Sequence, residues 1–329
     1  MRLMLVLVAA LSLTASSCTG EPAPELKLDP ASLTVSGISS GGYMAVQYHV
    51  AHSRSVAGAG IIAAGPWYCA EASLARALGS CMQGDPAPDA AALAAAARDA
   101  ARNGAIDDVA GLATDKVWVF HGSRDAVVTR PVTDALVGFY RAFLPEGSIR
   151  YETGVPAAHG FPTLDEGIAC GTTSEPWLND CDYDAAGTLL QQLYGPLEPR
   201  GKAMDGNLRV LEQARYAPGG TLPSMEALGY VYVPTRCARG AACRIHVAFH
   251  GCRQGTSFVG KAFVRKAGYN EWAETNDIVV LYPQAASSLV MPLNPQGCWD
   301  YWGYTGPGYA TRNGAQVATV EKMLKALGL

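Results

Sequence analysis

Apolar runs that alternate with helical stretches along the chain predict its secondary structure. Short apolar or alternating runs predict strands at 31–35, 56–64, 116–120, 149–152, 208–216, 228–233, 244–249 and 278–282. Stretches of helical propensity predict helices at 43–52, 90–101, 131–143, 258–275 and 314–327. Strands that alternate with helices indicate an α/β fold, in which a mostly parallel central sheet carries helices on both faces.

The pattern divides the chain into one large domain, residues 31–329, and a short N-terminal part. We find no internal repeat and no linker long enough to separate a second domain. Residues 66–113 hold the alanine-rich run and are interpreted as an inserted helical excursion, whereas residues 165–200 are rich in loops. Residues 19–30 contain prolines and charged side chains, so we expect a flexible leader there.

Residues 1–18 have the pattern of a secretory signal peptide. Arg2 gives a positive start, residues 3–13 are apolar, and small residues follow at 15–17. Such a segment is too short to span a bilayer in the mature protein. Cys18 also resembles a weak lipoprotein signal, which makes a lipid anchor the alternative. No later stretch is long and apolar enough to be transmembrane, so we expect a secreted or periplasmic protein, or a membrane-anchored lipoprotein.

Eight cysteines follow Cys18, and an even number in an exported chain indicates disulfide bonds. They are Cys69, Cys81, Cys170, Cys181, Cys237, Cys243, Cys252 and Cys298. Nearness in sequence favours pairing each of the first six with its neighbour, which leaves Cys252 with Cys298, although the count alone allows other connectivities. A zinc site fits poorly because no C-x-x-C spacing occurs. We expect no metal and no cofactor.

The composition is that of a globular protein without a bias towards nucleic acid. The 329 residues are 49% hydrophobic and 16% charged, with a formal net charge of −4. A small negative net charge gives no overall field that attracts nucleic acid. We therefore expect no nucleic-acid partner.

The strongest chemical signal is the pentapeptide Gly37-Ile38-Ser39-Ser40-Gly41, between a predicted strand and a predicted helix. A G-x-S-x-G turn in this context is the nucleophile elbow of α/β-hydrolases. The turn is strained, and its glycines leave room where the strand and helix backbones approach each other. It lifts the Ser39 hydroxyl and aims the amide of Ser40 at the carbonyl under attack. Outside this context the pentapeptide is an ordinary Gly/Ser turn.

A serine nucleophile needs a base and a carboxylate that orients the base. Among the six histidines, His159 lies in a loop beyond a strand end, whereas the others lie on the helix behind Ser39, within a strand or in His-Gly turns. The acid is expected beyond a strand that precedes the histidine. Asp125 meets this order, and Asp165 is the alternative that follows His159. The simpler interpretations are a solvated loop histidine and a turn-forming aspartate.

The expected oxyanion loop lies outside the usual order of elements. In most α/β-hydrolases a loop containing His-Gly precedes the nucleophile, but the best match here, His250-Gly251-Cys252, lies late in the chain. The strand that usually opens the sheet would then follow the histidine base. This order predicts a circular permutation in which helix 314–327 leads towards strand 31–35. Permutation is tolerated where the new chain ends lie at the surface.

Together these motifs resemble the circularly permuted, single-domain extracellular poly(3-hydroxybutyrate) depolymerases. The matching stretches are 37–44, 121–125, 158–161, 250–252 and 294–303, which cover nearly the whole mature chain in the same order. The combination is much more specific than any one motif. The resemblance implies a permuted α/β-hydrolase fold and a polymeric substrate.

The resemblance also implies a role for each matching residue. The catalytic residues would be Ser39 as nucleophile, His159 as base and Asp125 as orienting acid. The amides of Ser40 and Cys252 would form the oxyanion hole. Trp302 would line the substrate crevice with Trp299 and Tyr301 near it, although loop aromatics often belong to the core. The implied reaction is hydrolysis of polyester bonds through an acyl-enzyme.

Two alternatives to a polyester hydrolase follow from other features. Residues 227–270 contain seven basic side chains and no acidic one: Arg236, Arg239, Arg244, Arg253, Lys261, Arg265 and Lys266. A basic groove would suit a polyanion, and poly(aspartic acid) hydrolases resemble the same permuted family. A solvated basic face is the simpler interpretation. The other alternative is a non-catalytic polymer-binding protein, against which the intact Ser39, Asp125 and His159 argue.

Overall fold

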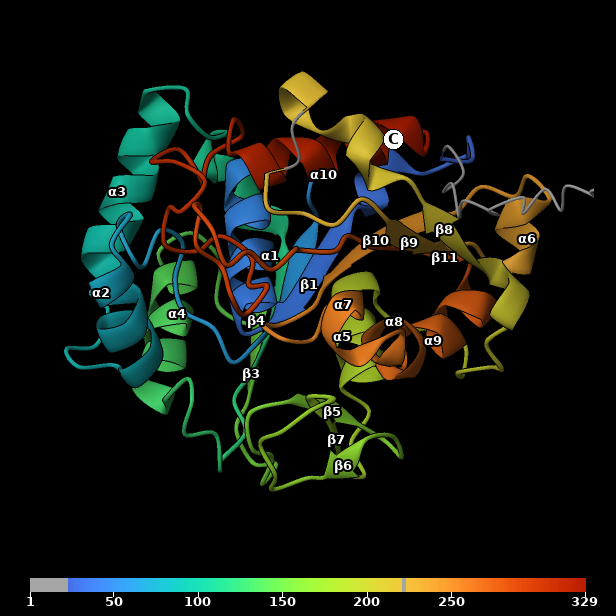
Figure 1. The fold of residues 1–329 in the computed structure, drawn as a ribbon, viewed down its shortest axis with the longest axis horizontal. Helices are drawn as coiled ribbons and strands as arrows, with labels where there is room; N and C mark the ends of the chain where they lie inside the picture. Colours follow the sequence, from blue (N-terminus) through green and yellow to red (C-terminus); the bar gives the residue numbers. More distant parts are fainter. Residues whose placement is uncertain (1–22, 221–222) are drawn as a thin grey trace, which may run out of the picture.

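A computed structural model describes residues 23–220 and 223–329 of the chain. The expected signal peptide at 1–18 and the lipidation candidate Cys18 therefore lie outside the described residues. The core is an eight-stranded sheet with the order β4-β3-β2-β1-β10-β11-β9-β8 (Figure 1). Its strands are β1 Thr34–Ile38, β2 Gly58–Ile62, β3 Lys116–Phe120, β4 Ile149–Glu152, β8 Leu208–Leu211, β9 Gly229–Tyr232, β10 Arg244–Phe249 and β11 Ile278–Tyr282.

The six strands from β4 to β11 run parallel, and β9 and β8 continue the sheet antiparallel. The mostly parallel α/β class predicted from the sequence is confirmed. Strand β1 lies between β2 and β10, with Gly37 opposite Ile61 on one side and Phe249 on the other. Strand order alone does not reveal which chain order is ancestral, so circular permutation stays an interpretation of the sequence.

Helices cover both faces of the sheet (Figure 1). On one face α1 Ser40–Ala51 packs on β1, β2 and β10, and α4 Arg130–Arg141 and α10 Ala315–Ala326 lie on the same side. On the other face α5 Ala185–Tyr194 packs on β2 and β3, and α9 Tyr269–Asn276 packs on β11. Every residue of α1 is buried, which explains the absence of polar spacing in its sequence.

The excursion predicted at 66–113 is helical. A small second sheet is formed by the chain between β4 and β8. The excursion contains α2 Leu74–Leu78, η2 Gly79–Gln83, α3 Ala90–Arg102 and η3 Val109–Thr114. The small sheet has strands β5 Phe161–Thr163, β6 Ile168–Ala169 and β7 Leu178–Asp180. Strand β5 begins two residues after His159, and the amide of His159 donates to the Thr173 hydroxyl oxygen at 3.3 Å in the loop before β7.

Several predicted boundaries are wrong, for local reasons. The first strand begins at Thr34 because Asp29 caps a 3-10 turn, η1 Pro30–Ser32, before it. The stretch 208–216 is a strand only to Leu211. The stretch 258–275 contains α7 Thr256–Val259, α8 Ala262–Lys266 and α9, because Gly260 and Gly268 adopt positive φ angles of 58° and 91° between them. The loop-rich stretch 165–200 also contains α5, whose first turn is capped by the Asp184 carboxylate.

The eight cysteines form four disulfide bonds, which are the four pairs that nearness in sequence favours. The bonds are Cys69–Cys81, Cys170–Cys181, Cys237–Cys243 and Cys252–Cys298. Three of them close short loops, with sequence separations of 12, 11 and 6. The fourth joins two loops 46 positions apart in sequence, both at the carboxyl ends of the parallel strands.

The described part of the expected leader, residues 23–30, forms backbone hydrogen bonds with the domain, while its flexibility stays a prediction. The amide of Leu26 donates to the carbonyl of Leu327 at 3.0 Å, and the amide of Asp29 donates to the carbonyl of Cys243 at 2.9 Å. Leu28 forms a parallel bridge with the same cysteine. In the part of the chain that the structure describes, no helix combines the length and the apolar character needed to cross a membrane.

Candidate active site

The turn between β1 and α1 holds Ser39 in a strained backbone conformation. Ser39 has φ 57° and ψ −125°, a backbone conformation that residues other than glycine rarely adopt. A Cβ atom on Gly37 would overlap the carbonyl oxygen of Gly41, and one on Gly41 would overlap the carbonyl oxygen of His250. Glycine is therefore required at both positions. The geometry agrees with the nucleophile elbow expected from the sequence, and Ser39 remains partly exposed on a pocket.

His159 and Asp125 form a buried hydrogen-bonded pair. The distance from His159 Nδ1 to Asp125 Oδ2 is 2.8 Å. The other carboxylate oxygen of Asp125 accepts the amides of Val127 and Val128 at 2.8 and 3.1 Å. Burial favours the protonated carboxyl, but the hydrogen bonds outweigh it and lower the pKa of Asp125. The pair therefore holds an ionised carboxylate against one ring nitrogen and leaves Nε2 to face a reactant.

Asp165, the alternative acid, lies elsewhere. It is exposed and lines a different pocket from the one that His159 lines. The structure brings Asp125 and not Asp165 to the histidine, in agreement with the expected chain order.

The loop that carries His159 is held by a neighbouring loop. The amide of Ala158 donates to the carbonyl of Cys170 at 2.8 Å, and Cys170 belongs to the loop that the Cys170–Cys181 disulfide closes.

Ser39 and His159 line one pocket of about 670 Å³ at the carboxyl ends of the parallel strands. Its walls are largely apolar. Residues that sequence reasoning missed line it on three sides: Leu74, Leu78 and Met82 from the helical excursion, Val127 and Val128 beside the acid, and Met291 and Leu293 from a late loop. A signal for the last two was present in the sequence, because the apolar run 289–293 lies between the predicted strand 278–282 and the predicted helix 314–327, where no element was expected to bury it.

The segment His250-Gly251-Cys252 follows β10 and borders the same pocket. A Cβ atom on Gly251 would lie 3.5 Å from the Cβ atom of Ser39, so this segment lies directly beside the serine. Ser40 opens helix α1, and the first amide of a helix has no acceptor within it. Within the described residues the amide of Cys252 also has no acceptor. Two backbone donors are thus available at the serine.

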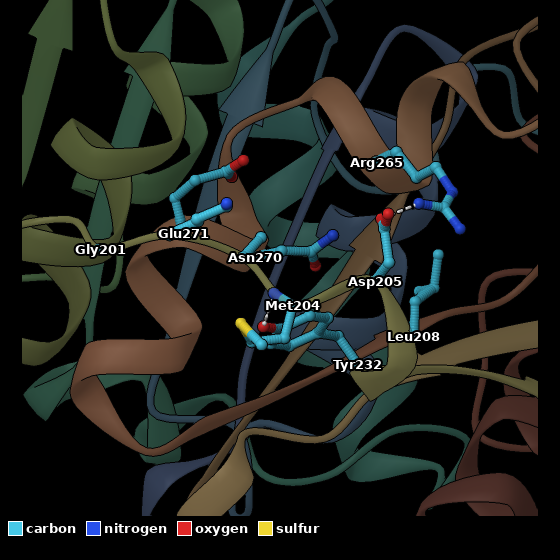
Figure 2. Close-up of a pocket in the computed structure, with 10 residues that line it drawn as sticks. Gly201, Met204, Asp205, Leu208, Tyr232, Arg265, Asn270 and Glu271 are labelled. Atoms are coloured by element: carbon cyan, nitrogen blue, oxygen red, sulfur yellow. Dashed lines mark hydrogen bonds and ion pairs between the residues drawn. The ribbon is translucent and has the colours of Figure 1, made fainter.

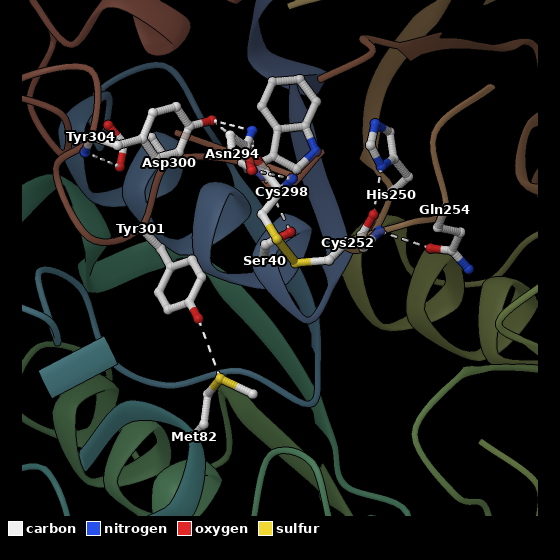
Figure 3. The surroundings of a disulfide bond; sticks show 12 residues. Ser40, Met82, His250, Cys252, Gln254, Asn294, Cys298, Asp300, Tyr301 and Tyr304 are labelled. Atoms are coloured by element: carbon white, nitrogen blue, oxygen red, sulfur yellow. Dashed lines mark hydrogen bonds between the residues drawn. A yellow bond between two sulfur atoms is a disulfide. The ribbon is translucent and has the colours of Figure 1, made fainter. Parts of the chain in front are cut away.

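The disulfide Cys252–Cys298 connects this segment to the aromatic loop that begins at Trp299 (Figure 3). Trp299 adjoins the pocket through its amide, which donates to the Ser40 hydroxyl oxygen at 3.3 Å, but the expected contact of its side chain with the substrate is not supported. Its side chain is fully buried, packs edge-on against Phe249 with ring centroids 5.2 Å apart, and does not line the pocket. Trp299 instead supports the sheet beneath the pocket.

Tyr301 and Trp302 do line the pocket. Tyr301 stacks on Tyr43 with ring centroids 4.6 Å apart, and Trp302 is partly exposed. The buried Asp300 carboxylate holds this loop, because it accepts the amides of residues 302–305 at 2.6 to 3.2 Å. The crevice aromatics are therefore presented on a rigid loop.

The basic run does not form a groove. Four of its members are in ion pairs with carboxylates: Arg236 with Asp277, Arg253 with Glu175, Arg265 with Asp205, and Lys266 with Glu166. Of the seven, only Arg253 lines the pocket of Ser39. With four of the seven paired and the run spread over several elements, no basic groove forms beside Ser39, which agrees with the simpler interpretation of a solvated face.

Two other features carry no comparable chemistry. A second pocket of about 630 Å³ is bordered by Met204, Tyr232 and Glu271, and Arg265 points toward Asp205 at its side (Figure 2). It contains no arrangement of nucleophile and base among the described residues. Cys237, Cys243 and Asp277 lie close enough to suggest a metal site, but the two sulfurs are bonded to each other and offer no thiolate.

Comparison with known proteins gives the following similarities. The chain is 42% identical over 306 residues to a poly(3-hydroxybutyrate) depolymerase of Delftia acidovorans, a match that covers 92% of this chain and 60% of that protein. The chain thus spans about three fifths of that relative. It is 34% identical over 331 residues to a polyhydroxybutyrate depolymerase of Talaromyces funiculosus, a match that covers 96% of this chain and 95% of the relative. No protein-family model matches the chain.

Solved structures extend the similarity to the fold. The crystal structure of a PHB depolymerase from Penicillium funiculosum has a TM-score of 0.87 and 32% identity, with 94% of this chain and 99% of that chain covered. A serine-to-alanine variant of a PHB depolymerase, in complex with an R3HB trimer, has the same TM-score, identity and coverage.

Proposed function

Because the chain belongs to the poly(3-hydroxybutyrate) depolymerase family, we propose that it hydrolyses the ester bonds of poly(3-hydroxybutyrate)-type polyesters with Ser39 as the nucleophile. The observation that carries the proposal is the bonded pair of Asp125 and His159 at the same pocket as the strained serine. The sequence order Ser, Asp, His supports it as well. No metal or cofactor takes part in the proposed reaction.

The proposed reaction has two halves. His159 Nε2 takes the proton of the Ser39 hydroxyl as the oxygen attacks the ester carbonyl. The amides of Ser40 and Cys252 donate to the oxyanion, each worth about 3 kcal/mol of transition-state stabilisation. Asp125 stabilises the imidazolium, which then protonates the leaving alkoxide oxygen, so that the cleaved polymer departs with a hydroxyl end. Water repeats the sequence on the acyl-enzyme and releases the acid.

The polyester fits the lining of the pocket. A chain of hydroxyalkanoate units is neutral and carries small alkyl groups, and the walls offer leucine, methionine and valine side chains with Tyr301 and Trp302. The complex of a related depolymerase with an R3HB trimer points to the same chemical class.

The proposed mature enzyme comprises the leader 19–30 and one catalytic domain, residues 31–329, exported by a signal peptide at 1–18. Four disulfide bonds require an oxidising compartment, which supports a secreted or periplasmic location. A lipid anchor at Cys18 is the variant of this proposal in which the domain stays at a membrane surface.

The proposal is tested by the products. The purified protein is incubated with amorphous poly(3-hydroxybutyrate) and, separately, with poly(aspartic acid), and the soluble products are identified by mass spectrometry. We expect 3-hydroxybutyrate and its oligomers from the polyester, and none from the Ser39→Ala variant. Aspartate oligomers would show instead that the protein is a poly(aspartic acid) hydrolase. Their rate of formation should then fall steeply with added salt, because the screening length shortens to about 8 Å at 0.15 M. Polymer binding without products would leave a non-catalytic binding protein.

A further inference from the structure

His250 is a fully buried histidine at the end of β10, close to the proposed oxyanion residue Cys252. Both of its ring nitrogens have hydrogen-bond partners. Nδ1 lies 2.7 Å from the carbonyl oxygen of Gly251 (Figure 3). Nε2 lies 3.0 Å from the amide of Ala285. The mechanism assigns no role to this imidazole.

The two partners determine which nitrogen carries the proton. A backbone amide can only donate, so Nε2 accepts from Ala285 and is unprotonated. A carbonyl oxygen can only accept, so Nδ1 carries the proton and donates it to Gly251. Burial lowers the pKa of His250 to about 4, which keeps this neutral tautomer over the neutral pH range.

The bond to the Gly251 carbonyl sets the direction of the next amide. The carbonyl of Gly251 and the amide of Cys252 belong to one planar trans peptide, in which C=O and N–H point in opposite directions. A carbonyl held toward the His250 ring therefore turns the Cys252 N–H away from the ring. That amide has no acceptor within the described residues, and Cys252 lines the pocket beside Ser39.

Gln254 holds the other end of the same glycine. Its Oε1 accepts the amide of Gly251 at 2.7 Å (Figure 3). Its Nε2 donates to the carbonyl of Trp177 at 2.7 Å. The disulfide to Cys298 then holds the side chain of Cys252. The peptide between Gly251 and Cys252 is thus fixed at both ends, and His250 is the group that fixes its rotation.

We propose that His250 is a positioning residue, whose Nδ1–H orients the Gly251–Cys252 peptide so that the Cys252 amide donates to the oxyanion. The inference rests on the proposed function, since it assigns a role within that reaction. His250 itself does not contact the reacting atoms. Its contribution appears only when negative charge develops on the carbonyl oxygen, so it affects kcat more than KM.

Two substitutions, His250→Asn and His250→Gln, separate this role from simple packing. The shorter asparagine side chain would place an amide N–H where Nδ1 lies, whereas the longer glutamine side chain would reach the position of Nε2. Both variants lose part of a buried side chain, so both lower the unfolding temperature. We expect His250→Asn to retain most of the wild-type kcat toward a soluble 3-hydroxybutyrate trimer. We expect His250→Gln to lose about 10- to 100-fold in kcat with little change in KM, below the loss for deleting an oxyanion donor.

The matched control is His246, another fully buried histidine, which lies in β10 four residues before His250. Its ring nitrogens form hydrogen bonds with the hydroxyls of Thr34 and Ser36. His246→Gln is expected to lower the unfolding temperature and leave kcat unchanged. An alkylboronic acid, which forms a tetrahedral adduct with a serine hydroxyl, supplies a second readout. Its affinity should fall in His250→Gln in parallel with kcat. Equal kcat values in His250→Gln and wild type, or equal losses in the two His250 variants, would overturn the inference.

A third measurement does not depend on activity. Nitrogen-15 NMR of the wild-type protein reports the tautomer of each histidine, and we expect a neutral His250 with the proton on Nδ1. A proton on Nε2 would overturn the inference even in an active enzyme. An inactive wild type would instead contradict the proposed function, so the two failures are distinguishable.

Discussion

Gly41 in helix α1 contacts the backbone carbonyl of His250 so closely that no side chain fits between them. The contact joins the nucleophile turn to the oxyanion segment without any side chain in between. Two parts of the chain more than 200 positions apart thus meet at backbone distance. The relative position of the proposed nucleophile and oxyanion donors depends on this contact.

Gly41→Ala is expected to separate the two segments. A methyl group would overlap the carbonyl oxygens of Phe249 and His250, and such overpacking costs about 1–3 kcal/mol of stability. Ester turnover should fall further than stability alone explains, because the oxyanion amides shift away from the serine. Thermal unfolding and kcat are measured together. Gly206→Ala is the control, since no atom lies within 4 Å of its added Cβ, and wild-type behaviour of both variants would contradict the role of the contact.

Asp125→Asn tests the orienting acid. The amide keeps the size of the side chain but can turn its NH₂ group toward His159 Nδ1, which favours the wrong tautomer of the base. We expect kcat to fall about 10³- to 10⁴-fold with the fold intact, in line with triads of this type. Steady-state kinetics and circular dichroism check this. Asp165→Asn should behave as wild type, and the reverse result would exchange the two acids.

Removing the Cys252–Cys298 bond is expected to affect activity before folding. The bond closes a loop of 46 positions, which is worth up to about 4 kcal/mol in the chain-entropy view. Because it also ties the oxyanion segment to the aromatic loop, the double Cys→Ser variant should lose turnover at temperatures where it remains folded. The double variant of Cys237 and Cys243 is the control, and it should retain kcat. Equal turnover in the two double variants would contradict the role of the Cys252–Cys298 bond in holding the oxyanion segment.

Exposed apolar side chains at 289–293 predict adsorption to a solid polymer. Leu289 and Val290 are 83% and 75% exposed, on a loop closed by paired backbone bonds between Ser288 and Asn294. Burying one such side chain against a polymer is worth about 1.5–3 kcal/mol. Leu289→Ser with Val290→Ser should therefore reduce binding to a polyester film at least about tenfold while turnover of a soluble ester stays constant.

The matched control for adsorption is Met204→Ser. Met204 is 50% exposed but borders the second pocket, away from the proposed active site. Its replacement should leave film binding unchanged, and depletion assays with labelled protein measure both variants. Loss of film binding in the Met204 variant alone would place the adsorbing surface elsewhere.

Acid should destabilise the fold through two buried histidines. Burial lowers the pKa of His246 to about 3 and that of His250 to about 4, whereas both titrate near 6.5 when unfolded. The unfolded chain then binds more protons, so stability falls as the pH drops from about 6.5 toward 4. Each histidine contributes up to about 1.4 kcal/mol per pH unit. Urea unfolding across this range should show a free energy of unfolding that decreases as the pH falls, and His246→Gln should reduce this dependence. An unchanged pH dependence would contradict the contribution of the buried histidine.

The sequence predicted most central strands and the helices α1, α3, α4 and α10 well, but it missed α5 and the breaks within 258–275. Strands 116–120, 149–152, 244–249 and 278–282 match the structure because each is a short apolar or alternating run with polar residues or turns at its ends. Helix α5 was missed because Gly187 and Thr188 weaken its propensity. The structure needs the glycine, since a Cβ there would overlap the Trp272 ring. Tertiary packing, and not local preference, makes this segment helical.

The site could be assembled from motifs, but its walls could not. Ser39 and His159 line one pocket and Asp125 bonds His159, as their order and strand-end positions predicted, and their roles remain predictions until the variants are measured. Trp299 and Trp302 lie three positions apart in one loop without periodicity. No pattern distinguishes the fully buried Trp299 from the pocket-lining Trp302, because the Asp300 hydrogen bonds determine how the loop turns.

The position of β1 between β2 and β10 has a consequence for synthesis. Strand β2 follows β1 closely, but β10 ends only at Phe249. While the ribosome makes the intervening residues, one edge of an apolar strand has no partner. Such an edge can pair with another nascent chain and aggregate. We therefore expect the chain to stay unfolded, or bound to a chaperone, until β10 has emerged.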